Sequence, residues 1–188
     1  MSASRGAALQ RYVAFLRAIN VGGHVVKMAD LRAIFEALRF ANVETFIASG
    51  NVLFGSAERD VAALELKIER RLARALGYDV ATFLRTPSEL SRLVDELPFT
   101  DDVAAGCSLS VAFLKAPPEP AAVERLDQLR SSVDELLVRG RELYWLCRGR
   151  TSESKVWRTP LEKVIGMPAT LRNATTVRKL AIRTSGVA

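Results

Sequence analysis

The order of its apolar runs constrains this chain more than any other feature. Between residues 12 and 84, short β-rich runs alternate with amphipathic helical patterns in the order β-α-β-β-α-β. We expect strands at 12–19, 43–48, 52–54 and 80–84, and helices at 28–38 and 61–76. Asp60 before the second helix and Gly77 after it are typical cap residues. This order is that of the ferredoxin-like arrangement.

A second, partial copy of the same order follows a connecting helix. That helix is expected to begin with the capping box Thr86-Pro87-Ser88-Glu89 and to end at Pro98. The pattern then predicts a strand at 109–113, a helix at 118–130, a hairpin at 133–147, a broken helix at 154–165 and a last helix from Asn173. Only a short segment, residues 168–172, stands where a fourth strand belongs.

The sequence therefore predicts an α+β chain of two tandem ferredoxin-like (βαββα) halves, the second lacking a clear fourth strand. The expected boundaries are 12–86 for the first half, 87–107 for the connecting helix and loop, and 108–188 for the second half with its C-terminal helix. The order of elements supports this division, and no residue-level repeat is part of the argument.

Composition narrows the class of protein. Hydrophobic residues make up 49% of the chain, enough for a folded core. No apolar run reaches the roughly 18 residues of a membrane span, and no signal-peptide pattern precedes the first strand, so we expect a cytoplasmic protein. Cys107 and Cys147 lie far apart and outside any CxxC pattern, which favours reduced thiols, with a single disulfide as the alternative. No residue spacing predicts a metal site or a cofactor.

The positive charge is concentrated in the last 50 residues. The formal net charge is +6. From Arg139 onward, eleven Lys and Arg stand against three Glu, a net charge of +8, whereas the first 138 residues carry sixteen basic and eighteen acidic residues, a net charge of −2. A basic end on a near-neutral body predicts a partner that carries phosphates or other anions. An arginine-rich solvated surface also explains the count, because Arg outnumbers Lys 21 to 6.

The topology predicts that two polar loops meet. In this arrangement the first two strands run the same way, so the loop after the first strand and the turn after the second leave the sheet at one edge. That edge would bring together Asn20, Gly22, Gly23, Ser49, Gly50 and Asn51. Glycines let backbone N–H groups approach a ligand, and the next helix presents its positive end beside Lys27. The arrangement suits a phosphate or carboxylate, although turn geometry alone also explains the glycines.

Three segments together carry a family resemblance. They are residues 17–23 with 27–31, residues 49–52, and residues 168–180. In order and spacing they resemble the bacterial domain-of-unknown-function 1697 family over residues 12–180. Ala18 stands where the family usually has glycine, and Ala174 where it usually has an aromatic residue. The resemblance implies an α+β fold with ferredoxin-like halves, and it implies no reaction.

These observations predict a protein that binds a small anionic, phosphate-bearing ligand at the edge between the two loops. The predicted ligand-binding residues are Arg17, Asn20, Gly22, Gly23, Lys27, Ser49, Gly50, Asn51 and Arg172. The Arg and Lys side chains would supply charge, the glycines backbone donors and the asparagines hydrogen bonds. Arg172 and Lys179 belong to the C-terminal segment, where Asn173 is expected to cap a helix, and whether they join the first-half site is left open.

Two other functions remain as alternatives. The first is non-specific nucleic-acid binding by the basic C-terminal half, through Arg139, Arg141, Arg148, Arg150, Lys155, Trp157 and Arg158. Its two tryptophans, Trp145 and Trp157, are expected in the core. RNA-recognition sheets expose aromatic residues on one face, whereas the first strand here is apolar on both faces. The second alternative is a small enzyme that uses His24, the only histidine, as an acid or base.

Overall fold

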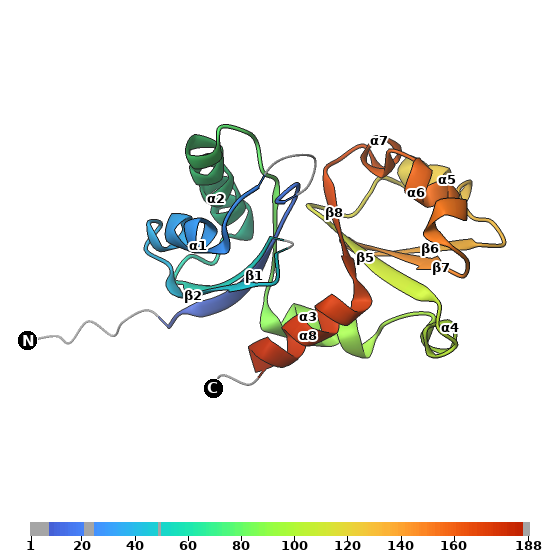
Figure 1. The fold of residues 1–188 in the computed structure, drawn as a ribbon, viewed down its shortest axis with the longest axis horizontal. Helices are drawn as coiled ribbons and strands as arrows, with labels where there is room; N and C mark the ends of the chain where they lie inside the picture. Colours follow the sequence, from blue (N-terminus) through green and yellow to red (C-terminus); the bar gives the residue numbers. More distant parts are fainter. Residues whose placement is uncertain (1–7, 21–24, 49, 186–188) are drawn as a thin grey trace, which may run out of the picture. The chain divides into compact units, whose positions relative to one another are not determined.

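The computed structural model describes residues 8–20, 25–48 and 50–185, and the chain divides into two compact units after Glu89. The first unit contains β1 (Gln10–Leu16), α1 (Met28–Glu36), β2 (Ala41–Phe46), β3 (Asn51–Ser56), α2 (Val61–Leu76) and β4 (Thr82–Arg85) (Figure 1). Helix α3 (Pro87–Asp95) spans the boundary. The second unit continues with α4 (Thr100–Ala104), β5 (Ser108–Leu114), α5 (Pro120–Asp127), β6 (Asp134–Arg139), β7 (Glu142–Cys147), a 3-10 turn (Thr151–Glu153), α6 (Lys155–Arg158), α7 (Leu161–Ile165), β8 (Ala169–Asn173) and α8 (Ala174–Ser185).

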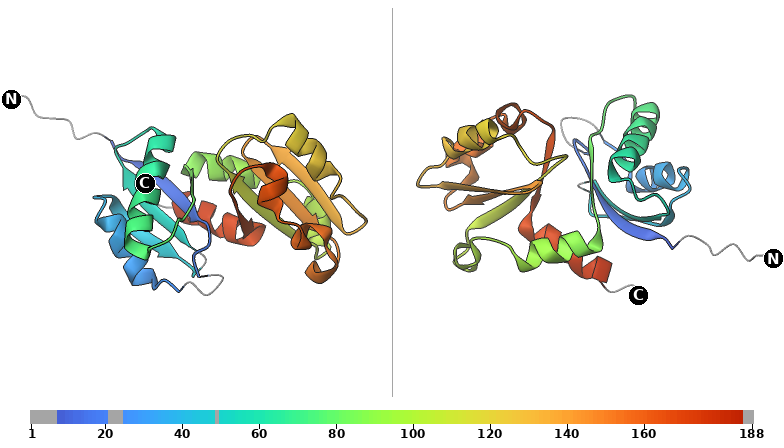
Figure 2. Two further views of the ribbon diagram at one scale, coloured as in Figure 1. Left: turned by 90° about the horizontal axis from the view of Figure 1, so that it is seen from above. Right: turned by 180° about the vertical axis from the view of Figure 1, so that it is seen from behind.

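Each unit is built on one four-stranded antiparallel sheet. The strand order is β2-β3-β1-β4 in the first unit and β6-β7-β5-β8 in the second. Helices α1 and α2 cover one face of the first sheet, where Leu31, Phe35, Leu64 and Ile68 pack with alternate residues of the central strands. Helices α5, α6 and α7 cover one face of the second sheet (Figure 2, right). Mixed helices and antiparallel sheets confirm the α+β class.

The prediction that the second half lacks a clear fourth strand is wrong. Strand β8 pairs with β5 over five residue pairs, from Leu114 opposite Ala169 to Ser110 opposite Asn173. Its polarity explains the error, because Thr170 and Arg172 are buried while Leu171 between them is 37% exposed. The usual alternation of buried apolar and exposed polar residues is thus inverted in this strand.

The two sheets also share a residue-level repeat, which corrects the expectation that the element order alone relates the halves. The tetrapeptide Val-Ala-Phe-Leu occupies residues 13–16 of β1 and residues 111–114 of β5. In both sheets its valine stands opposite an arginine of the fourth strand, Arg85 in one and Arg172 in the other. The two sheets therefore carry the same tetrapeptide at the same register.

The helix ends follow their local sequence signals. Asp60 Oδ1 accepts a hydrogen bond from Ala63 N at 3.0 Å and caps α2, and Gly77 ends this helix with φ of 81°. Thr86 and Glu89 form the predicted capping box at α3, with Thr86 N donating to Glu89 Oε2 at 2.8 Å.

No helix in the described segments has both the length and the apolar character to cross a membrane.

Candidate functional site

The loop after β1 and the turn after β2 meet at one edge of the first sheet. Leu16 N donates a hydrogen bond to Gly50 O at 2.8 Å, which joins the end of β1 to the turn. Asn20 Nδ2 donates to Ala48 O at 2.9 Å, which joins the two loops a second time. The structure therefore brings Asn20, Gly50 and Asn51 together.

Asn20 organises its own loop. Its Oδ1 accepts a hydrogen bond from Val26 N at 2.6 Å, so one amide group holds both ends of the loop and the neighbouring turn. Asn20 has φ of 57°, in the left-handed region that asparagine tolerates better than most residues. In the sequence, Gly22, Gly23 and His24 come between Asn20 and Val26. Like Ser49, they fall outside the described residues.

Gly50 and Asn51 lie where the turn after β2 packs against the loop after β1. Gly50 has φ of 73°, and a Cβ added there would lie 2.8 Å from Ile19 Cβ, so glycine is required for both its backbone conformation and its close approach. Asn51 is fully buried, and its Nδ2 donates to Phe46 O at 3.1 Å across the turn. Hence Asn51 holds the turn closed from within.

Left-handed backbone conformations gather in these two loops. Six non-glycine residues in the described part of the chain have positive φ, and three of them, Ala18, Asn20 and Ile47, belong here. Such a conformation is a clear outlier for a β-branched residue such as Ile47. Strained backbone persists where the surrounding structure holds it in place, and it concentrates at ligand-binding and catalytic sites.

Replacing Ala18 with glycine is expected to stabilise the protein. Ala18 has φ of 59°, a conformation that costs an alanine roughly 1–2 kcal/mol. The added freedom of glycine in the unfolded chain offsets about 0.4–1 kcal/mol of this. We expect urea unfolding to give a free energy of unfolding about 0.5–1 kcal/mol higher, and Ala33→Gly, inside α1, to lower it by about 1 kcal/mol. A loss of stability in Ala18→Gly would show that the loop does not hold this conformation in solution.

Two cations stand beside the edge. Lys27 is exposed and is the N-cap residue of α1, where its side chain makes no capping hydrogen bond. Arg17 is half-buried, and its backbone N donates to Ala81 O at 2.9 Å. The positive end of the α1 dipole adds to these charges. The edge therefore combines two cations, a helix start and a backbone held in an unusual conformation.

Arg172 belongs to the second unit, where it lies in β8 just before α8. It is 7% exposed, and its Nη1 donates to Thr170 Oγ1 and to Leu171 O, both at 2.8 Å. Burial lowers the pKa of Arg172 to about 10. Asn173 Oδ1 accepts from Thr175 N at 2.8 Å, as expected of a helix cap. A role for Arg172 in ligand binding stays a prediction.

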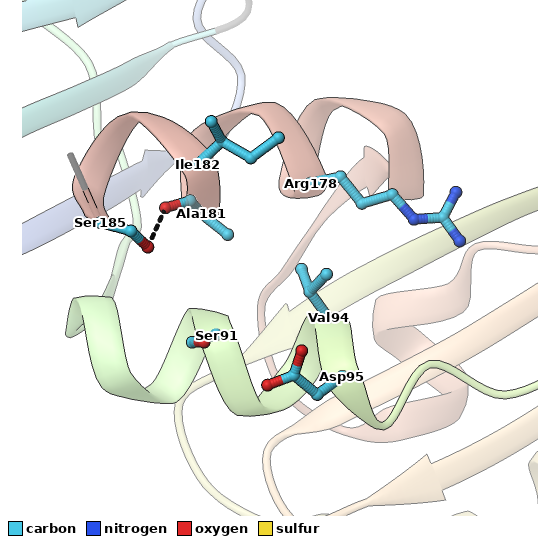
Figure 3. A pocket seen from close by; sticks show the side chains of 7 residues that line it. All are labelled: Ser91, Val94, Asp95, Arg178, Ala181, Ile182 and Ser185. Atoms are coloured by element: carbon cyan, nitrogen blue, oxygen red, sulfur yellow. Dashed lines mark hydrogen bonds between the residues drawn. The ribbon is translucent and has the colours of Figure 1, made fainter.

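A further pocket lies between α3 and α8 in the second unit (Figure 3). Its volume is about 480 Å³, and it is lined by Ser91, Val94, Asp95, Arg178, Ala181, Ile182 and Ser185. Ile182 is 74% exposed, and the Ser185 hydroxyl donates back to Ala181 O at 2.8 Å. With a mostly apolar lining and one acid against one guanidinium, it is less suited to an anion than the loop edge.

Several cations of the C-terminal half are engaged within the protein. Arg139 Nη1 donates to Glu96 O at 2.7 Å, Arg148 Nε to Asp102 Oδ1 at 2.9 Å, and Arg158 Nε to Ser154 O at 3.2 Å. Trp145 is buried as expected, but the core position expected for Trp157 is wrong, because it is 65% exposed. Helix α6 has only four residues and turns Val156 inward, which leaves Trp157 on its outer side.

Comparison with known proteins places the chain in a family. Residues 9–144 match the family described as "Protein of unknown function (DUF1697)". The chain belongs to this family. A conserved bacterial protein from Streptococcus pneumoniae, SP0830, has a structure similar to this DUF1697 chain, with a TM-score of 0.77 and 24% identity over 95% of this chain and 99% of that one. This likeness shows the fold. No curated protein matches the chain.

Ile19 and Ala48 contribute to the edge without having been predicted. One packs against Gly50, and the other accepts the Asn20 amide through its carbonyl group. Neither residue type carries a sequence signal for binding, because one acts by shape and the other through its backbone.

Proposed function

We propose that this DUF1697 protein binds a small phosphate-bearing anion at the edge where the loop after β1 meets the turn after β2. The observation that carries the proposal is the Asn20 amide, which ties the two loops together while the backbone around it is held in left-handed conformations. Lys27, Arg17 and the start of α1 supply the positive charge. Gly22, Gly23 and Ser49, outside the described residues, remain in the proposal as backbone and hydroxyl donors.

The described contacts assign different tasks to the site residues. Asn51 and the Asn20 amide already bond to backbone groups of the loops, so they shape the site. Lys27, which is exposed and makes no capping hydrogen bond, is then the main side chain through which the anion would be held, and Arg17 adds positive charge beside it. Because Lys27 is exposed and solvent screens its charge, its pair with an anion is worth up to about 1 kcal/mol.

The same reasoning extends to the architecture. We infer that both units are ferredoxin-like halves of a tandem repeat, supported by their matching strand orders and by the shared Val-Ala-Phe-Leu strand. The rival proposals have less support. Arg139, Arg148 and Arg158 are engaged internally, and His24 lies outside the described residues.

A thermal-shift titration tests the proposal with inorganic phosphate, AMP and glucose 6-phosphate, each against chloride at equal ionic strength. At 100 times its Kd a bound anion stabilises the protein by about 2.7 kcal/mol, which raises Tm by roughly 5–10 °C for a chain of this size. Lys27→Ala is expected to weaken that binding about 2- to 5-fold, equivalent to about 0.4–1 kcal/mol. Lys163→Ala, an exposed lysine of α7, is the matched control and should bind as the wild type does. The proposal fails if no probe shifts Tm, or if both variants bind equally well.

A further inference from the structure

The acidic and the basic side chains of helix α2 lie on different sides of the helix. Its two acids face the sheet: Glu65 Oε1 accepts Leu84 N and Glu69 Oε1 accepts Thr82 N, both at 2.8 Å. Strand β4 lies at the edge of its sheet, so these backbone N–H groups have no neighbouring strand to bond. The carboxylates take the place of that strand and are thereby withdrawn from the outer surface.

The exposed charged residues of α2 are consequently all cations. Lys67, Arg70, Arg71 and Arg74 are all exposed. Within the described part of the chain, no acid pairs with Arg70, Arg71 or Arg74, and Lys67 Nζ lies 5.3 Å from the centre of the Phe40 ring. The sequence conceals this asymmetry, because the helix interleaves its two acids with its cations.

Helices α1 and α2 lie side by side (Figure 1). The cations of α2 line a groove that also includes Leu38, just after α1. Its volume is about 440 Å³, and its lining residues are Leu38, Ala63, Leu66, Lys67, Arg70, Arg71 and Arg74. Of these residues none is acidic, and Leu66 is 45% exposed. From Lys67 to Arg74 the cations extend over about 10 Å of helix at 1.5 Å per residue.

We propose that this α2 groove binds the sugar–phosphate backbone of a nucleic acid. An exposed cation binds a single small anion weakly, since solvent screens the pair, whereas a row of cations gains from a ligand with many charges in line. Three of the four are arginines, whose planar guanidinium groups match phosphate in two-pronged contacts. Beside its cations the lining has only Leu and Ala side chains and no Asn, Gln, Asp or Glu to select among bases, so we expect phosphate contacts to dominate and recognition to depend little on sequence. This site shares no residue with the loop edge.

Fluorescence anisotropy with a labelled 20-nucleotide DNA strand, from 50 to 200 mM NaCl, tests the proposal. The triple variant Arg70→Ala, Arg71→Ala and Arg74→Ala is expected to bind at least tenfold more weakly at 50 mM NaCl. It should also reduce the slope of log K against log salt by about 2–3. The control removes three exposed lysines of the second unit, Lys155→Ala, Lys163→Ala and Lys179→Ala, and should change affinity about twofold or less.

Conversion of the same three arginines to lysine separates charge from geometry. This variant keeps the net charge and should keep most of the salt slope, while the lost guanidinium contacts weaken binding several-fold.

The proposal is overturned if the wild type does not bind DNA at 50 mM NaCl, or if the control loses as much affinity as the alanine variant. It is likewise overturned if polyglutamate or phosphatidylserine vesicles of equal charge bind the protein more tightly than the DNA does, because the partner would then be an acidic protein or a membrane. Phosphate binding at Lys27 is measured separately, so either site can fail alone.

Discussion

Replacing Asp134 with alanine is expected to lower the free energy of unfolding by about 3–5 kcal/mol. Asp134 is fully buried, and its carboxylate accepts hydrogen bonds from Ser154 Oγ at 2.6 Å, Trp145 Nε1 at 2.9 Å and Lys155 N at 2.9 Å. Each buried donor that loses its acceptor costs about 1–3 kcal/mol. The carboxylate joins β6, β7 and the start of α6, so its loss affects the whole core between them.

The stability contributed by Asp134 also depends on pH. Burial alone raises the pKa of this carboxyl. Hydrogen bonds from Ser154, Trp145, Lys155 and Ser131 lower the pKa by more than burial raises it, so the pKa lies below the ordinary value of 3.8. The folded pKa is thus below the unfolded pKa. The carboxylate therefore contributes stability above about pH 3.8, and this contribution is lost as the pH falls from there towards the folded pKa.

Urea unfolding at pH 7, 5 and 3 measures both effects. Asp134→Asn keeps the shape but cannot titrate, so its stability deficit against the wild type should be largest at pH 7 and should narrow at pH 3. Asp127→Asn is the control, because Asp127 pairs with Arg130 at 3.4 Å on the exposed surface and should change stability by 0–1 kcal/mol. An Asp134→Ala protein within 1 kcal/mol of the wild type would contradict the proposed role of this network.

Local signals predict most of the helices and the first hairpin, but not the short helix α4. Asp60 and Gly77 bound α2, because the caps act through backbone groups of the same helix. Local signals do not predict strand β8, because the packing of the whole sheet decides which of its side chains are buried. Arg172 is opposite Val111 and buried, while Leu171 is exposed. The burial of Asp134 is not predicted either, since an acid at the start of a strand is usually a solvated charge.

The candidate site was predicted in part. Its location follows from topology alone, because two strands that run the same way end at the same edge. The tasks of Asn20 and Asn51 do not follow, since they depend on which backbone carbonyl groups the folded loops leave without a partner. The asymmetric surface of α2 has the same origin, as Glu65 and Glu69 turn inward only because β4 is an edge strand.

Replacing Gly50 with alanine is expected to destabilise the protein by about 2–4 kcal/mol. The left-handed conformation costs an alanine roughly 1–2 kcal/mol, and the new Cβ would lie 2.8 Å from Ile19 Cβ, a clash of the kind that costs about 1–3 kcal/mol. Gly77→Ala separates the two effects, because Gly77 has φ of 81° but nothing within 4 Å of the added Cβ. We expect this control to lose about 1 kcal/mol.

The same pair of variants connects stability to binding. If the clash pushes Ile19 and the turn apart, Gly50→Ala should bind inorganic phosphate more weakly at a temperature where it is still folded, whereas Gly77→Ala should bind as the wild type does. Urea unfolding and a phosphate titration of both variants give the two readouts. Equal stability losses would show that the loops have room to separate at Gly50, and unchanged phosphate affinity in Gly50→Ala would show that their close approach does not shape the binding edge.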